Sequence, residues 1–389
     1  MNTDSQQSFR SGPEAGPGPE VSQFDKLFAL RDRMLESQDF QRFSSAFPLT
    51  RGVARREAQQ LFDLCAGFVY SQILFACISL GVFDALKGGP LSLAVLSDRL
   101  SLPNAAAERL MRAAVALRLV ARRGQGRYGL GMLGAALNGN PSIAAMIRHH
   151  ALLYRDLADP VSLLRGERKG ELSHYWAYAS ETDNHTLVDA RVAEYSTLMA
   201  QSQTMIAQDI LDAYPLDRHR LLLDIGGGEG VFIAAAASRY PQLCFQLFDL
   251  PAVADRAADR FAQNGLTSRT EVLRGSFETD ALPTGADVVT LVRVLHDHDD
   301  AAVLGLLRKV RANLAADGAL LVAEPFAQTP GSERVGDAYF GFYLLAMGQG
   351  RPRSAAELTG MLREAGFGKI YEVPTRLPML TSALLAKPA

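Results

Sequence analysis

The chain has 389 residues, longer than one typical domain, and its 48% hydrophobic content excludes a wholly disordered or fibrous protein. A net charge of −2 excludes binding to nucleic acid or anionic lipid through bulk charge. The three cysteines, Cys65, Cys77 and Cys244, form no C-x-x-C pair, which argues against a disulfide framework or a zinc site and favours a reducing cytoplasm.

Residues 1–22 mix Ser, Gly, Pro and Gln, which predicts a disordered tail, and they contain no basic-then-apolar block typical of a signal peptide. The segment 64–83 has no formal charge and is long enough to span a membrane. Its Gly, Ser and Gln residues dilute the apolarity, and a helix buried on all sides in a protein or a dimer has the same composition. We expect this helix to pack in a homodimer interface.

Residues 61–137 have a helical pattern followed by a short hairpin with the turn G-Q-G at 124–126, an outline typical of a winged-helix module. The would-be recognition helix, 101–120, and the wing carry six arginines, which leaves a DNA-binding regulator open. These are Arg109, Arg112, Arg118, Arg122, Arg123 and Arg127. Because the module is not strongly basic overall, we favour a solvated face on a helical, winged-helix dimerisation domain over 23–137, followed by connecting helices over 138–220.

From residue 221 onward, short apolar runs alternate with helical patterns. The runs lie at 221–225, 244–248, 270–273, 288–294, 319–323, 369–373 and 382–386. Most gaps can hold a right-handed crossover helix, so the early strands should be parallel, whereas the last two should pair as a hairpin. The pattern predicts an α/β fold, a doubly wound seven-stranded Rossmann-like domain over 221–389.

The strongest chemical signal is L-D-I-G-G-G-E-G at 223–230, where the first strand meets a helix. Glycines such as Gly226 and Gly228 let the backbone approach a ligand closely, beside the free N–H groups of a helix N-terminus. The spacing does not fit the dinucleotide pattern G-x-G-x-x-G. Asp249 closes the second strand, where its carboxylate can accept both ribose hydroxyls of a nucleoside cofactor.

R-V-L-H-D-H-D-D at 293–300 follows the fourth strand, at the carboxyl edge where ligands bind in such sheets. A neutral His296, with an ordinary pKa near ~6.5, could act as general base towards a hydroxyl. A backbone-bonded histidine and a metal site are the alternatives. Metal is disfavoured because consecutive residues splay apart and no second cluster of ligands is apparent.

Together with R-G-S-F at 274–277 and V-A-E-P at 322–325, these motifs resemble the S-adenosylmethionine (SAM)-dependent O-methyltransferases of the plant caffeate and animal acetylserotonin type. The resemblance covers residues 60–389. It implies cofactor contacts from one set of residues, with His296 as the base and Glu324 orienting it. That set is Gly226, Gly228, Asp249, Gly275, Ser276, Phe277 and Arg293.

Three positions depart from the family pattern. Ser276 stands where the family usually has Asp, and His298 stands where a Trp usually follows the His-Asp pair. Pro352 replaces a second glutamate, so His296 must rely on Glu324, with Asp337 as a helper.

Within this family, the segments 173–179 and 338–354 and the C-terminal end resemble hydroxycarotenoid O-methyltransferases of purple photosynthetic bacteria. The resemblance implies methyl transfer to the tertiary 1-hydroxyl of an acyclic carotenoid, by an enzyme in the cytoplasm or peripheral at the photosynthetic membrane, with transient membrane contact. The aromatic and apolar residues that suit a polyene are Tyr339, Phe340, Phe342, Tyr343, Leu344, Leu345 and Met347.

Two alternatives stay open. The same cofactor residues would serve a methyltransferase of small phenols or hydroxylated aromatic metabolites. A winged-helix DNA-binding regulator with a degenerate methyltransferase domain is the alternative of another class, although the retained glycine turn, Asp249 and His296 argue against it.

Overall fold

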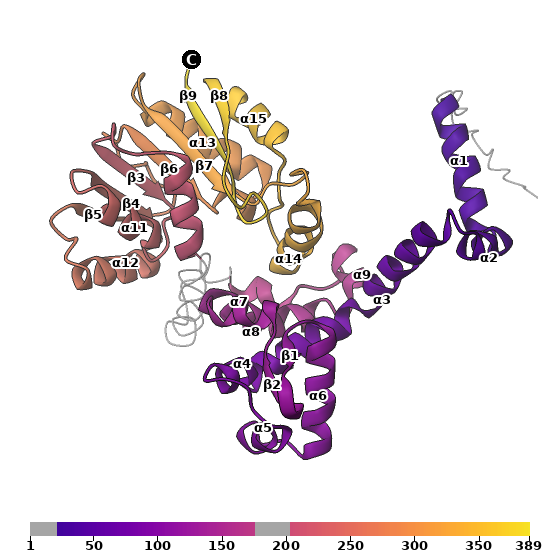
Figure 1. The fold of residues 1–389 in the computed structure, drawn as a ribbon. Helices are drawn as coiled ribbons and strands as arrows, with labels where there is room; N and C mark the ends of the chain where they lie inside the picture. The colour runs from indigo at the N-terminus through magenta and orange to yellow at the C-terminus, as the bar shows by residue number, and fades with distance from the viewer. Residues whose placement is uncertain (1–21, 176–202) are drawn as a thin grey trace, which may run out of the picture. The chain divides into compact units, whose positions relative to one another are not determined.

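The computed structural model describes residues 22–175 and 203–389, so the predicted tail, apart from its last residue, lies outside the described residues. The chain divides into two compact units, residues 1–73 and 74–389. Figure 1 gives the element labels used below.

The first unit contains α1 (Gln23–Glu36), α2 (Gln38–Ala46) and most of α3 (Arg51–Ser79). Ser22 caps α1 in a reciprocal capping box with Asp25. No residue of α1 or α2 is buried. Helix α3 is long and apolar enough to cross a membrane by length and composition, and it ends before Gly81 (φ +71°) instead of running to residue 83 as predicted. Its exposed apolar residues include Leu64 and Phe68.

The second unit opens with α4 (Val82–Leu86), α5 (Leu93–Arg99), α6 (Asn104–Ala116) and a hairpin of β1 (Val120–Arg122) and β2 (Tyr128–Leu130). The predicted G-Q-G segment is the turn of this hairpin. The Arg123 side chain donates to the Leu130 carbonyl at 2.9 Å, and the Arg122 guanidinium lies over the Tyr128 ring. These wing arginines therefore stabilise their own hairpin, which favours the structural interpretation over a DNA-contacting one.

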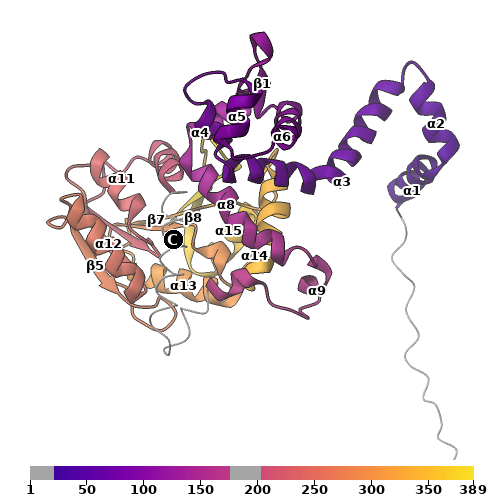
Figure 2. The ribbon, with the colours of Figure 1, turned by 90° about the horizontal axis from the view of Figure 1, so that it is seen from below.

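The connecting region contains α7 (Met132–Asn138), α8 (Pro141–Asp156), α9 (Pro160–Leu164), η2 (Glu171–Tyr175) and a helix at 203–213. Figures 1 and 2 both show α8 beside α14 (Gly341–Met347), a helix of the C-terminal region. Two hydrogen bonds between α8 and the segment 339–343 join these regions. Segments almost two hundred residues apart in sequence thus pack side by side.

The C-terminal region is a seven-stranded sheet in the order β5-β4-β3-β6-β7-β9-β8. The strands are β3 (Leu221–Ile225), β4 (Cys244–Asp249), β5 (Thr270–Arg274), β6 (Val288–Val292), β7 (Ala319–Glu324), β8 (Phe367–Val373) and β9 (Ser382–Pro388). β9 is antiparallel to both of its neighbours, β7 and β8, whereas the other neighbouring strands of this sheet pair in parallel. The predicted fold class, the seven strands and the final hairpin are confirmed.

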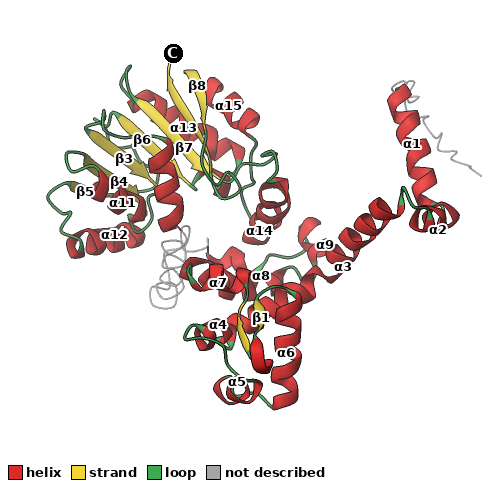
Figure 3. Ribbon diagram, viewed as in Figure 1, coloured by secondary structure: helices red, strands yellow, loops and turns green. Residues whose placement is uncertain are grey.

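Helices cover both faces of this sheet (Figure 3). The helix 203–213, α11 (Val231–Arg239) and α12 (Pro251–Gln263) supply the apolar core of one face. On the other face the core comes from α13 (Asp300–Asn313) and α15 (Ala355–Glu364). Burial on both faces explains the continuous apolar strands, such as β6, in which all five residues are buried. Because β3, β4, β6 and β7 are parallel, their carboxyl ends lie along one edge of the sheet.

Candidate functional site

The glycine-rich turn follows β3 directly and leads into α11. Gly226 has a left-handed backbone (φ +66°), and a Cβ there would lie 2.8 Å from a methyl group of Val294. The position therefore requires glycine, because the turn packs against the loop after β6. The Gly228 N–H donates to Asp249 Oδ2 at 2.8 Å, which joins the turn to the end of β4.

Asp249 accepts a second backbone hydrogen bond, from the Leu250 N–H at 2.7 Å. Burial raises the pKa of this carboxyl to about 6, although both amide donors act in the opposite direction. Each oxygen keeps a lone pair for a further donor. Paired hydroxyls such as those of a ribose could donate to these remaining lone pairs.

The segment 275–280 extends this site from the end of β5. The Gly275 N–H donates to the Asp249 carbonyl at 3.0 Å, and the Ser276 N–H donates to Asp280 Oδ2 at 2.8 Å. The Ser276 hydroxyl accepts from the Glu278 N–H. Lys309 clamps the turn by donating to three of its carbonyls, a role that sequence analysis missed because Lys309 lies on α13.

Two further residues named in the sequence analysis lie near this segment. Phe277 meets the ring of His298 edge-on, with centroids 4.9 Å apart, so His298 packs against the segment that follows β5. Arg293 adopts a left-handed backbone (φ +58°), unusual for a residue with a Cβ, and its N–H donates to the Ala323 carbonyl. Its half-buried side chain lies close enough to the Tyr339 hydroxyl to influence its pKa.

His296 lies on η4 (Leu295–Asp297) and is held between two carboxylates. Its Nδ1 is 3.3 Å from Glu324 Oε2, and the same oxygen accepts the His296 backbone N–H at 3.1 Å. Its Nε2 is 3.2 Å from Asp297 Oδ1. The structure thus brings Glu324 to His296 as expected and adds Asp297, which the sequence analysis left without a role.

The electrostatics of His296 differ from the ordinary imidazole assumed from sequence. Burial by itself lowers the pKa of His296, but the charges and hydrogen bonds of Asp297 and Glu324 outweigh burial and raise the pKa to about 9. With both carboxylates in contact, His296 is therefore protonated at neutral pH.

The replacement of the second glutamate is resolved differently from the sequence prediction. Asp337 is exposed and accepts the Gln328 N–H at 2.8 Å, so it fixes a loop and is not the predicted helper of His296. Gly350 approaches the histidine loop so closely that a Cβ would lie 2.2 Å from the His296 carbonyl oxygen. The segment 350–354 therefore supports the backbone of His296, not its imidazole.

Arg353 is the centre of this support, and sequence analysis missed it. The side chain is fully buried and donates to the carbonyls of Leu295 (2.8 Å) and His298 (2.7 Å), on either side of His296, and to Asp300 Oδ1 (2.6 Å). An arginine that binds two carbonyls of one loop fixes that loop's path. Its position next to Pro352 was the only signal in the sequence.

We expect Arg353→Met to lower the free energy of unfolding by about 3 kcal/mol, because two buried carbonyls lose their donor. Arg351→Met is the matched control, since Arg351 pairs with the same Asp300 from an exposed position and should cost no more than about 0.5 kcal/mol. Urea unfolding curves measure both. Equal effects of the two variants would contradict the assigned role of Arg353.

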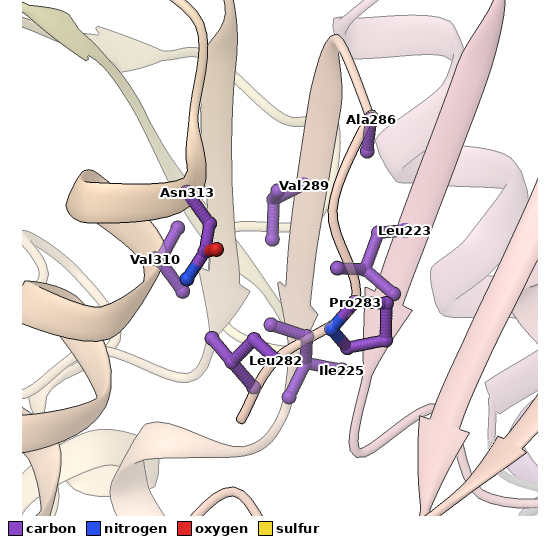
Figure 4. Close-up of a pocket in the computed structure, with 8 residues that line it drawn as sticks. All are labelled: Leu223, Ile225, Leu282, Pro283, Ala286, Val289, Val310 and Asn313. Atoms are coloured by element: carbon purple, nitrogen blue, oxygen red, sulfur yellow. The ribbon is translucent and has the colours of Figure 1, made fainter. Parts of the chain in front are cut away.

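Two other features bear on ligand binding. Within residues 22–175 and 203–389, no group of three or more His, Cys, Asp or Glu side chains is arranged to hold a metal ion. A small apolar hollow lies between β3, β6 and α13, and its lining residues are Leu223, Ile225, Leu282, Pro283, Ala286, Val289, Val310 and Asn313 (Figure 4). Neither Asp249 nor His296 lines it.

Comparisons with known proteins agree with this geometry. Residues 154–368 match the O-methyltransferase domain, and residues 62–138 match the O-methyltransferase dimerisation domain. Human N-acetylserotonin methyltransferase in complex with SAM has a similar fold, with a TM-score of 0.69 at 24% identity over 86% of this chain and 98% of that one. CalO1, a methyltransferase of calicheamicin biosynthesis, has a TM-score of 0.70 at 26% identity over 86% of this chain and 98% of its own.

The fold and the glycine turn thus define a SAM-dependent methyltransferase, and the chain belongs to the O-methyltransferase family. Its relatives include the demethylspheroidene O-methyltransferase of Cereibacter sphaeroides, 42% identical over 361 residues, which is 92% of this chain and 95% of that protein. The Rhodobacter capsulatus enzyme of the same name is 42% identical over 91% of this chain and 88% of its own. The dimerisation-domain match supports a homodimer.

The residues present fit SAM. The Gly226 turn leaves room only for backbone, Asp249 would offer two oxygens to a ribose, and Phe277 would provide a ring for the adenine. Gly228 follows β3, Gly275 and Ser276 follow β5, and Arg293 follows β6, at the same edge of the sheet. When bound there, SAM supplies an electrophilic methyl group.

Proposed function

We propose that this enzyme methylates the tertiary 1-hydroxyl of an acyclic hydroxycarotenoid, with His296 as the general base. The 42% identity to two demethylspheroidene O-methyltransferases, over nearly the full length of each chain, carries this proposal. The aromatic residues beside His296 supply a second, physical argument for an apolar substrate.

An aromatic wall, here meaning Tyr339, Phe340 and Tyr343, lies next to His296. The Phe340 ring centroid is 5.9 Å from that of His296 and 5.1 Å from that of Tyr339. These residues come from η5 (Arg334–Phe340), a π-helix, and the start of α14. Such helices are frequent at functional sites because the wider turn redirects side chains. Phe340 thus occupies the space beside the base.

The two hydroxyls of this wall are paired with histidines of α8. The Tyr339 hydroxyl bonds His150 at 2.8 Å and the Tyr343 hydroxyl bonds His149 at 3.0 Å. Burial lowers the pKa of both histidines, to about 4 for His149, and raises that of Tyr339 to about 12. The wall therefore carries no charge at neutral pH, which suits an apolar polyene.

The remaining residues of the predicted block divide between core and surface. Leu344 and Met347 are buried in a cluster with Leu153 and Leu172, whereas Phe342 is 38% exposed. They stabilise the helix that carries the wall, so the substrate contacts fall to Tyr339, Phe340 and Tyr343.

In the proposed mechanism, His296 accepts the hydroxyl proton as the oxygen attacks the methyl carbon. An aliphatic alcohol is too weak an acid to ionise first, so proton removal accompanies attack. Glu324 holds Nδ1 and stabilises the imidazolium that forms, while the wall excludes water and holds the hydroxyl in line.

A direct test is mass spectrometry of the products after incubation with labelled SAM and, separately, a 1-hydroxycarotenoid in micelles or a panel of phenols. We expect label on the carotenoid only. The phenols represent the second candidate, since mouse acetylserotonin O-methyltransferase is 31% identical over 81% of this chain and 85% of its own. Label on a phenol alone would remove the carotenoid assignment.

We further propose a cytoplasmic enzyme with transient, peripheral membrane contact, because a carotenoid dissolves in the bilayer. The exposed apolar residues of α3, among them Leu64 and Phe68, would serve the homodimer. Flotation with lipid vesicles and light scattering test these two statements, and a monomer that never floats would contradict both.

A further inference from the structure

His296 has one ring nitrogen on the buried side and one on the open side. Nδ1 faces Glu324, whose side chain has no exposed surface, whereas Nε2 faces Asp297, whose side chain is 16% exposed. Nε2 is therefore the nitrogen that a substrate hydroxyl can reach. Asp297 Oδ1 lies 3.2 Å from this nitrogen.

We propose that Asp297 is a positioning residue that keeps a proton on His296 Nε2 in the free enzyme, and that His296 releases this proton when SAM binds. The inference rests on the proposed role of His296 as base. It extends that role by assigning a function to Asp297 and by coupling cofactor binding to activation of the base.

The physical reason is repulsion between two positive charges, the imidazolium of His296 and the sulfonium of SAM. For in-line attack the substrate oxygen must contact both the methyl carbon and Nε2, so a bound sulfonium would lie within about 8 Å of that nitrogen. A positive charge that close disfavours the imidazolium. During transfer Nε2 accepts the proton of the substrate hydroxyl while the sulfonium becomes a neutral thioether. One positive charge thus replaces another, and the net charge of the site is the same before and after transfer.

Other charged and titratable groups around His296 do not blur this effect at pH 8. Burial lowers the pKa of His298, that of Tyr339 is about 12, and arginines keep their charge. In the cofactor cradle, burial raises the pKa of Asp249 to about 6 and that of Asp224 to about 7, so both are largely ionised at pH 8. The charged and titratable residues on the elements that pack around His296 are Asp297, His298, Glu324, Arg293, Arg353 and Tyr339.

The test is calorimetry of SAM binding at pH 8 in two buffers of different ionisation enthalpy, which counts the protons released. The ligand's own α-amino group titrates near this pH, so the informative number is the difference between the enzyme and His296→Asn. We expect the enzyme to release about 0.5–0.9 proton more than His296→Asn with SAM. With S-adenosylhomocysteine, which lacks the sulfonium charge, the difference should be close to zero.

Asp297→Asn should reduce the proton release, because His296 then begins with less negative charge at Nε2. Asp317→Asn is the matched control. This exposed residue lies just before the start of β7, at the end of the strand opposite Glu324, and its replacement should leave the proton release unchanged. Equal proton counts for the enzyme and His296→Asn, or for SAM and S-adenosylhomocysteine, would overturn the inference.

The same variants separate this inference from the proposed function. Proton release without methylation of a carotenoid would remove the substrate assignment and support the coupling. An inactive His296→Asn with no change in proton count would keep the base and remove the coupling. A fully active His296→Asn would remove both.

Discussion

Replacing His296 with Asn should reduce the rate of methyl transfer by about 10²–10⁴-fold, because no other group in its place can accept the hydroxyl proton during attack. His296 and Glu324 are buried, and Asp297 is partly exposed beside Nε2. The affinity for SAM should not fall, since the residues that fit the ribose lie on other strands, and at pH 8 it should rise by up to about tenfold if SAM binding expels the His296 proton. Single-turnover rates and calorimetric SAM affinity measure the two effects separately.

His219→Asn is the matched control for this loss. His219 is also partly buried and bonds Tyr214 at 2.9 Å, but it precedes β3, at the opposite edge of the sheet. Its replacement should leave the rate within about twofold. A His296→Asn enzyme as active as this control would refute the base assignment.

The pH dependence gives an independent check on the same residue. A pKa raised to about 9 means that the imidazole of the free enzyme is neutral only above that pH. The ratio kcat/KM for SAM reports the free enzyme, so it should rise with pH and level off above about 9. If SAM binding expels the proton, kcat should level off at a lower pH than kcat/KM. A midpoint near 6.5 for both kcat and kcat/KM would contradict the effect of Asp297 and Glu324 on the pKa of His296.

Asp249→Ala should weaken SAM binding by about 10²-fold or more, while the rate at saturating SAM changes far less. Two charge-assisted hydrogen bonds to ribose would be lost, each worth about 1.5–3 kcal/mol. The Gly228 N–H would also lose its acceptor, so the glycine turn becomes less ordered. Calorimetry measures the affinity, and methyl transfer at high SAM concentration measures the rate.

Asp287→Ala provides the comparison for Asp249. Its carboxylate likewise accepts two backbone N–H groups, those of Arg220 and Leu221, but it does so at the opposite end of the sheet. Its loss should affect stability and leave SAM affinity unchanged. An Asp249→Ala enzyme that binds SAM as well as Asp287→Ala does would exclude the ribose contact.

Much of the fold was determined by local sequence patterns. The strand β3 has the predicted bounds, 221–225, and the hairpin turn forms at 124–126, because apolar runs bounded by glycine specify strands and turns without reference to distant residues. The same holds for the cofactor side of the site. Gly226 and Asp249 end neighbouring parallel strands, so strand order alone places them together.

The environment of His296 was decided only by tertiary structure. Glu324 and Asp297 both contact its ring, and this shifts its pKa away from the ordinary value that the sequence suggested. Arg353 supports its loop from a segment more than fifty residues away. Tyr339 reaches His150 across 189 positions. Charge interactions and buried hydrogen bonds depend on distances between such segments, and those distances exist only once the chain has packed.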